Sequence, residues 1–106
     1  MSDPVRIATL DELPDGRGVR VDLEGSRIAV FRLGDDVYAV GDRCTHAEAS
    51  LAEGEVFDTA VECPRHGAEF DLTTGTGTLP ATRPVRVYDT SVVDGDVYLT
   101  LEGDPA

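Results

Sequence analysis

Every cysteine and histidine of this chain lies in one of two short motifs. The first is Cys44-Thr45-His46, the second is Cys63-Pro64-Arg65-His66, and sixteen residues separate them. Each motif pairs one thiol with one imidazole. Because proteins offer thiolates and imidazoles as ligands to zinc and to iron–sulfur clusters, the pattern predicts a metal centre. Its candidate ligands are Cys44, His46, Cys63 and His66.

Other interpretations of these four residues are less favoured. Two buried apolar cysteines with two hydrogen-bonded histidines would leave the pairing unexplained. A disulfide between Cys44 and Cys63 fits poorly with a sequence in which we find no secretory signal. Zinc in a tetrahedral site is a further alternative, but zinc fingers usually group cysteine with cysteine and histidine with histidine. The mixed motifs favour a two-iron, two-sulfur cluster, with two cysteines on one iron and two histidines on the other.

The two motifs and their surroundings resemble the Rieske iron–sulfur proteins, whose signature is C-x-H followed, after a gap, by C-x-x-H. The resemblance runs from about Val5 to Leu101, nearly the whole sequence. Beyond the motifs, the matching positions are Leu51, Gly54, Gly67, Phe70-Asp71, Thr74-Gly75 and Pro80-Ala81, the last resembling the family's proline-containing third loop.

This resemblance implies one Rieske-type 2Fe-2S cluster held by Cys44, His46, Cys63 and His66. The soluble ferredoxins of the family are the most similar subgroup. They imply a carrier of single electrons from a flavoprotein ferredoxin reductase to a non-haem iron oxygenase of the ring-hydroxylating type. Two alternatives are a Rieske ferredoxin for another redox partner, such as an iron–sulfur assembly pathway, and the small subunit of a nitrite reductase. A structural zinc module is the least favoured.

The resemblance also bears on the reduction potential. High-potential relatives carry a Ser and a Tyr that donate hydrogen bonds to sulfurs of the site, and the matching residues here are Ala68 and Phe70. Since neither has a hydroxyl, we expect a potential toward the low end of the Rieske range. Gly67, Gly75 and Gly77 are expected to supply turns or close backbone approach around the cluster.

We expect an electron carrier with no catalytic residues. Oxygen activation at a mononuclear non-haem iron needs two histidines and a carboxylate, and both histidines are committed to the cluster. The same commitment excludes a Cys-His nucleophile, and no glycine-rich dinucleotide fingerprint opens a helix.

The elements that must position the site are short strands between Gly, Asp and Pro residues. We predict an all-β fold, a Rieske-like antiparallel β-sandwich, with a small cluster-binding subdomain inserted at about residues 41–80. The chain of residues 1–106 is predicted to form a single Rieske domain. Hairpin turns are expected at Gly34-Asp35-Asp36 and Asp94-Gly95, and one helical turn at Leu10 to Leu13. The predicted strands are 5–8, 19–23, 28–33, 37–40, 55–57, 60–62, 69–72, 85–88, 92–93 and 97–101.

Charge and hydropathy limit the partners. Nine basic and twenty-one acidic side chains give a net charge of −12. An acidic surface repels phosphate backbones and anionic headgroups, so we expect protein partners and neither nucleic acid nor membrane. The sequence has no apolar run long enough to span a bilayer and no signal-like start. We therefore expect a cytoplasmic protein, and we also expect a monomer.

Overall fold

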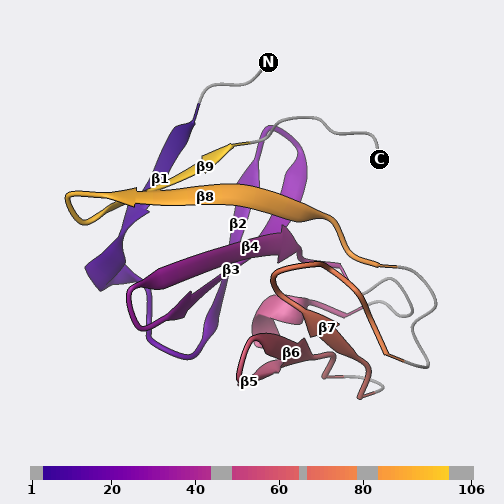
Figure 1. Ribbon diagram of the computed structural model, residues 1–106. Helices are drawn as coiled ribbons and strands as arrows, with labels where there is room; N and C mark the ends of the chain where they lie inside the picture. Colours follow the sequence, from indigo (N-terminus) through magenta and orange to yellow (C-terminus); the bar gives the residue numbers. More distant parts are fainter. Residues whose placement is uncertain (1–3, 44–48, 65–66, 79–83, 101–106) are drawn as a thin grey trace.

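The computed structural model describes residues 4–43, 49–64, 67–78 and 84–100. Within them most of the regular structure is antiparallel strand (Figure 1), which confirms the predicted all-β class. The two short 3-10 helices are η1 (Leu10–Glu12) and η2 (Leu51–Glu53). The strands are β1 (Val5–Thr9), β2 (Gly18–Leu23), β3 (Ser26–Leu33), β4 (Asp36–Gly41), β5 (Glu55–Phe57), β6 (Ala60–Glu62), β7 (Glu69–Asp71), β8 (Val87–Val93) and β9 (Asp96–Thr100).

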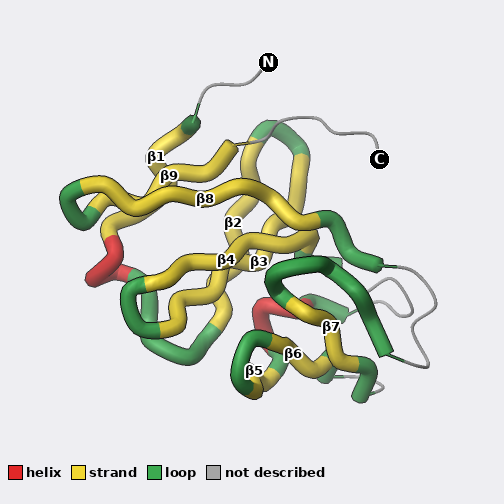
Figure 2. The backbone as a smooth tube through the Cα atoms, in the orientation of Figure 1, coloured by secondary structure: helices red, strands yellow, loops and turns green. Residues whose placement is uncertain are grey.

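The larger sheet has the strand order β1-β9-β8-β4-β3-β2. Strand β8 joins its two halves, because Val87 and Tyr88 pair with β4 whereas the residues from Asp89 onward pair with β9. Figure 2 shows this long strand running across both halves. Apolar side chains from the two halves meet in one core, made of Leu13, Ile28, Val30, Val37, Ala39, Tyr88, Val97 and Leu99.

Strand β3 is buried on both of its faces. Ile28, Ala29, Val30 and Phe31 are all fully buried, although side chains alternate between the two sides of a strand. Ile28 and Val30 face the core described above, while Ala29 and Phe31 belong to a second core. This explains the uninterrupted apolar run from Ile28 to Phe31, which differs from the alternation typical of a sheet with one solvent-exposed face.

The second core joins the large sheet to a small one with the order β5-β6-β7. The small sheet and η2 lie beside β3 and β4 in Figure 1 and fall inside the predicted insertion at 41–80. The shared core consists of Ala29, Phe31, Val40, Leu51, Val61, Cys63, Ala68, Phe70, Leu72 and Val85. The inserted subdomain is therefore packed directly on the scaffold.

The hairpin turns follow the residues that permit positive φ. Gly34 has φ 68° between β3 and β4, and Asp94 and Gly95 have φ 51° and 81° between β8 and β9, as predicted. A further two-residue turn, Glu24-Gly25 between β2 and β3, was not predicted; its φ angles are 50° and 85°. Two successive positive φ values suit the right-handed twist of a hairpin.

One prediction about local structure needs correction. Residues 85–88 and 92–93 were expected to form separate strands, but Val87–Val93 is one strand and Val85 lies outside it. The polar residues between them continue the strand because they pair with β9. The predicted helical turn after Thr9 is confirmed as η1, and a bond from Thr9 N to Glu12 Oε1 at 2.9 Å caps it.

We expect the stability of the fold to depend on glycine at position 18, where β2 packs closely against η2. A Cβ at this position would lie 2.8 Å from Ala52 O and 2.6 Å from Phe31 Cε1. We expect Gly18→Ala to lower the free energy of unfolding by roughly 1–3 kcal/mol, since the backbone of Ala52 must move. Urea unfolding followed by far-ultraviolet circular dichroism measures this.

Gly41→Ala is the matched control, because the nearest atom to its Cβ would be Arg86 N at 3.9 Å. Its stability should change by less than about 1 kcal/mol. Equal stability of the two variants would contradict the close approach at Gly18.

Candidate metal centre

The site begins with Cys63, the one predicted ligand among the described residues. Its thiol is free and its side chain is 1% exposed. It lies in the second core, in the same cluster as Leu51, Val61 and Phe70. The other predicted ligands, Cys44, His46 and His66, lie outside the described residues. The segments that flank them are described, and they define how each ligand loop is held.

The loop that carries Cys63 and His66 connects β6 to β7. Glu62 and Glu69 form the last pair of the two strands. Beyond that pair, Cys63 N donates to Ala68 O at 2.7 Å, and Gly67 N donates to Cys63 O at 3.1 Å. Gly67 has φ +79°, which glycine adopts without strain. Cys63 thus sits where a closed hairpin begins its turn.

The loop that carries Cys44 and His46 is closed at its ends. Arg43 and Ser50 form an isolated antiparallel bridge. Just beyond it, Leu51 N donates to Asp42 O at 2.6 Å. The backbone thus brings the residues before and after 44–48 together, as a ligand loop requires.

The predicted third loop, Pro80-Ala81, lies outside the described residues, but both of its flanks are anchored. On one side Thr78 N donates to Glu69 O at 2.9 Å. On the other side Val85 N donates to Gly75 O at 2.9 Å. Gly75 has φ +82°, and a Cβ there would collide with Val85 O, so this position requires glycine for both reasons.

Asp71 organises the turn that leads to Gly75. Its Oδ1 accepts bonds from Thr73 N at 2.8 Å and Thr74 N at 3.3 Å, and also from the Thr73 hydroxyl. These bonds lower the pKa of Asp71 because they stabilise its ionised form. The bond from the Thr73 hydroxyl has the largest effect, and the bond from Thr73 N has the second largest. Ionised Asp71 stabilises the turn fully at pH values above the pKa that Asp71 has in the unfolded chain. This stabilisation is lost as the pH falls through the lower pKa of Asp71 in the folded protein.

The described part of the site fits one thiol ligand of a cluster held by two thiols and two imidazoles. Cys63 offers a buried, free thiol at a tight turn, and no disulfide ties it up. Ala68 and Phe70 belong to the same buried core, and neither has a hydroxyl. The thiol of Cys63 therefore lies in an apolar part of the molecule that solvent barely reaches.

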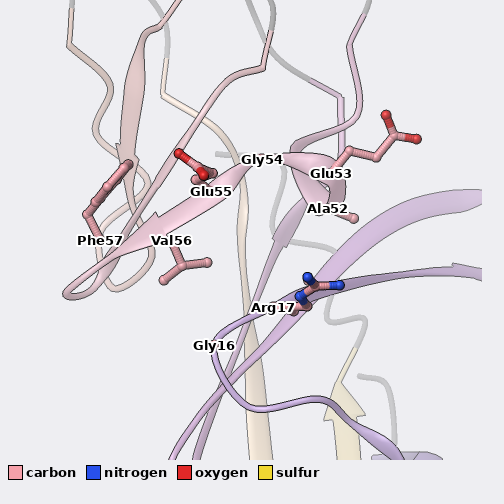
Figure 3. Close-up of a pocket in the computed structure, with 9 residues that line it drawn as sticks. Gly16, Arg17, Ala52, Glu53, Gly54, Glu55, Val56 and Phe57 are labelled. Atoms are coloured by element: carbon pink, nitrogen blue, oxygen red, sulfur yellow. The ribbon is translucent and has the colours of Figure 1, made fainter.

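A hollow elsewhere on the molecule was not predicted from the sequence. It lies between the start of β2 and the segment from η2 to β5 (Figure 3), with Arg17 on one side and Glu53 and Glu55 on the other. None of the described residues that line it is a cysteine or histidine.

The sequence analysis also gave no role to Asp42, whose burial is the main unexpected feature beside the first ligand loop.

Comparison with known proteins identifies the family of this chain. Residues 3–89 match the model of the Rieske [2Fe-2S] domain family. The chain is 44% identical over 97 residues to the 3-phenylpropionate/cinnamic acid dioxygenase ferredoxin subunit of Photorhabdus laumondii, covering 90% of this chain and 91% of that one. None of the helices among the described residues is long and apolar enough to cross a membrane.

Solved structures show the same likeness. The ferredoxin of carbazole 1,9a-dioxygenase from Nocardioides aromaticivorans IC177 has a TM-score of 0.87 and 42% identity, covering 92% of this chain and 97% of that one. A chain in the complex of reduced oxygenase and oxidized ferredoxin in carbazole 1,9a-dioxygenase has a TM-score of 0.86 and 35% identity, covering 94% of each chain.

These relatives are named ferredoxins, which confirms the prediction of an electron carrier that is not itself an enzyme. The predicted cofactor is also confirmed, since the matching family is defined by its cluster. The chain belongs to the Rieske [2Fe-2S] domain family, and its cofactor is one Rieske-type 2Fe-2S cluster.

Proposed function

We propose that this protein passes single electrons from a flavoprotein ferredoxin reductase to a non-haem iron oxygenase of the ring-hydroxylating type. The likeness that carries the proposal is the 44% identity, over 90% of the chain, to a dioxygenase ferredoxin subunit. The likeness to a ferredoxin seen in complex with its oxygenase supports the choice of acceptor.

The ligand assignment is part of this proposal. Cys44 and Cys63 bind one iron as thiolates, and His46 and His66 bind the other through ring nitrogens. The buried free thiol of Cys63 supports the assignment, as do the bonds that close both ligand loops. The bound cluster supplies one-electron chemistry at roughly −150 to +300 mV, above the approximately −400 mV of plant-type ferredoxins.

The chain's own residues account for this difference in potential. Two neutral imidazoles replace two thiolates, so the site carries less negative charge and accepts an electron more readily. The loops around Cys63 and Gly75 are fixed by backbone hydrogen bonds of 2.7–3.1 Å. Such preorganised loops hold the ligands in one geometry in both redox states.

The setting of the carrier follows from the same proposal. Residues 1–106 act as one Rieske domain, and the protein works as a monomer in the cytoplasm. The net charge of −12 supports encounters with basic surfaces on the reductase and on the oxygenase.

Stopped-flow mixing of the reduced holoprotein with a ring-hydroxylating oxygenase tests the function. Absorbance of the carrier should return to that of the oxidised state as the oxygenase is reduced. A carrier that stays reduced with such oxygenases, but is oxidised by a nitrite reductase or an iron–sulfur assembly protein, would contradict the proposed acceptor.

Metal content should follow the ligand assignment. We expect two irons and two labile sulfides per chain and no stoichiometric zinc, because the mixed motifs serve two irons. His46→Cys and His66→Cys should each lose the cluster or give an electron paramagnetic resonance spectrum closer to that of an all-cysteine ferredoxin. One zinc and no iron, in protein purified in air without refolding, would contradict the assignment.

Electron transfer should slow as salt is added. An acidic carrier is steered toward basic partners over a distance that salt reduces to about 10 Å at 0.1 M. We expect the second-order rate of transfer to the oxygenase to fall by roughly tenfold between low and high salt. A rate independent of salt would show that the charge serves solubility alone.

The reduction potential should depend on the missing hydroxyls. Ala68→Ser and Phe70→Tyr each add a hydroxyl to the buried core that contains Cys63, and the effect requires that the hydroxyl reaches a sulfur. A hydrogen bond to sulfur that strengthens by about 1 kcal/mol on reduction raises the midpoint potential by about 40 mV for one electron. Protein-film voltammetry measures the midpoint, which in the wild type should lie low in the Rieske range.

Phe57→Tyr is the matched control, since Phe57 is 48% exposed and its new hydroxyl would meet water. Its potential should equal that of the wild type. Unchanged potentials in both buried variants, with crystal structures showing the new hydrogen bonds in place, would overturn this explanation.

A further inference from the structure

Asp42 is the one fully buried charged side chain among the described residues. It follows the last residue of β4, Gly41, and precedes Cys44 by two positions. Asp42 is not one of the proposed cluster ligands, and the proposed electron transfer does not require it. A carboxylate without water must be compensated by partners, so its contacts indicate its role.

The carboxylate holds groups from two different parts of the fold. Its Oδ2 accepts a bond from Arg27 Nη2 at 3.2 Å, and Arg27 belongs to the scaffold strand β3. Its Oδ1 accepts bonds from Ser50 Oγ at 2.7 Å and from Ala52 N at 2.9 Å. Ser50 and Ala52 both follow the segment 44–48. One side chain thus links the scaffold to the far end of the first ligand loop.

The backbone of Asp42 repeats these two links. Its N–H donates to Arg27 O at 3.0 Å, and its carbonyl accepts from Leu51 N at 2.6 Å. Between the described ends of the loop, Arg43 and Ser50 also form an isolated antiparallel bridge. The bonds to Asp42 add to this bridge in closing the loop.

This arrangement requires a carboxylate. Three donors converge on its two oxygens, and each oxygen is used as an acceptor. An asparagine has one acceptor oxygen, and its amide group is a donor. With the oxygen toward Ser50 and Ala52, the amide would face the Arg27 guanidinium, which has donors only.

We propose that Asp42 is a positioning residue for the cluster: its buried carboxylate ties the loop of Cys44 and His46 to β3 and so fixes two of the four ligands. This rests on the ligand assignment proposed above. Asp42 acts through the loop and does not itself bind iron.

Asp42→Asn tests the proposal in the holoprotein. We expect the visible absorbance of the cluster to be lost roughly tenfold faster or more, as for other residues that orient metal ligands. The g-values of the reduced cluster should also shift. Asp22→Asn is the matched control, because Asp22 pairs with Arg20 on the exposed surface of β2, at 3.0 Å. That variant should match the wild type in both measurements.

Ser50→Ala gives a second, milder test if Asp42→Asn does not fold. It removes one of the three donors and keeps the charge, so cluster loss should be faster by a smaller factor. Ser50→Thr keeps the hydroxyl and should restore the wild-type rate and spectrum.

A general structural role would lower the melting temperature but leave the g-values of the intact cluster unchanged, and this result in Asp42→Asn would overturn the proposal. So would equal rates of cluster loss in Ser50→Ala and Ser50→Thr. The wild-type spectrum reports on the proposed function, whereas the differences between variants report on Asp42 alone.

Discussion

The burial of strand β3 on both faces is the constraint on which the rest of the structure depends. Its side chains alternate between two cores, with Ile28 and Val30 in one and Ala29 and Phe31 in the other. The same strand therefore contributes to the core of the large sheet and to the core shared with the inserted subdomain. Arg27, near its start, reaches the buried carboxylate before the first ligand loop. Substitutions in β3 would therefore affect the large sheet, the inserted subdomain and the site together.

The inserted subdomain holds the ligand loops in place although its strands are very short. Its strands β5, β6 and β7 have three residues each, too few to be stable alone. Packing on Ala29, Phe31 and the neighbouring strand β4 supplies the missing burial. The loops then need only local bonds at their ends, such as those of Cys63 with Ala68 and of Gly75 with Val85. A rigid base with short closed loops suits an electron carrier, whose site must keep one geometry.

Much of this could be predicted from the sequence, and the failures have physical causes. The ligand motifs and the hairpins at Gly34 and Asp94-Gly95 follow from local residue chemistry. The prediction divided strand β8 in two because the polar residues at its centre, 89–91, are typical of a loop. In the structure these residues pair with β9, and this pairing determines their conformation. Asp42 could not be assigned, since its partners Arg27 and Ser50 come together only through the fold. The need for glycine at Gly18 likewise depends on a contact between distant segments.

The central claim is that both histidines bind the cluster, and labelled histidine tests it most directly. The sequence contains two histidines, His46 and His66. Pulsed electron paramagnetic resonance of the reduced protein, grown with ¹⁵N-histidine, should therefore show two strongly coupled ¹⁵N nuclei. Substituting either residue should remove one coupling from any cluster that survives. A cluster signal without ¹⁵N coupling would contradict the account, because its irons would then be held by other ligands.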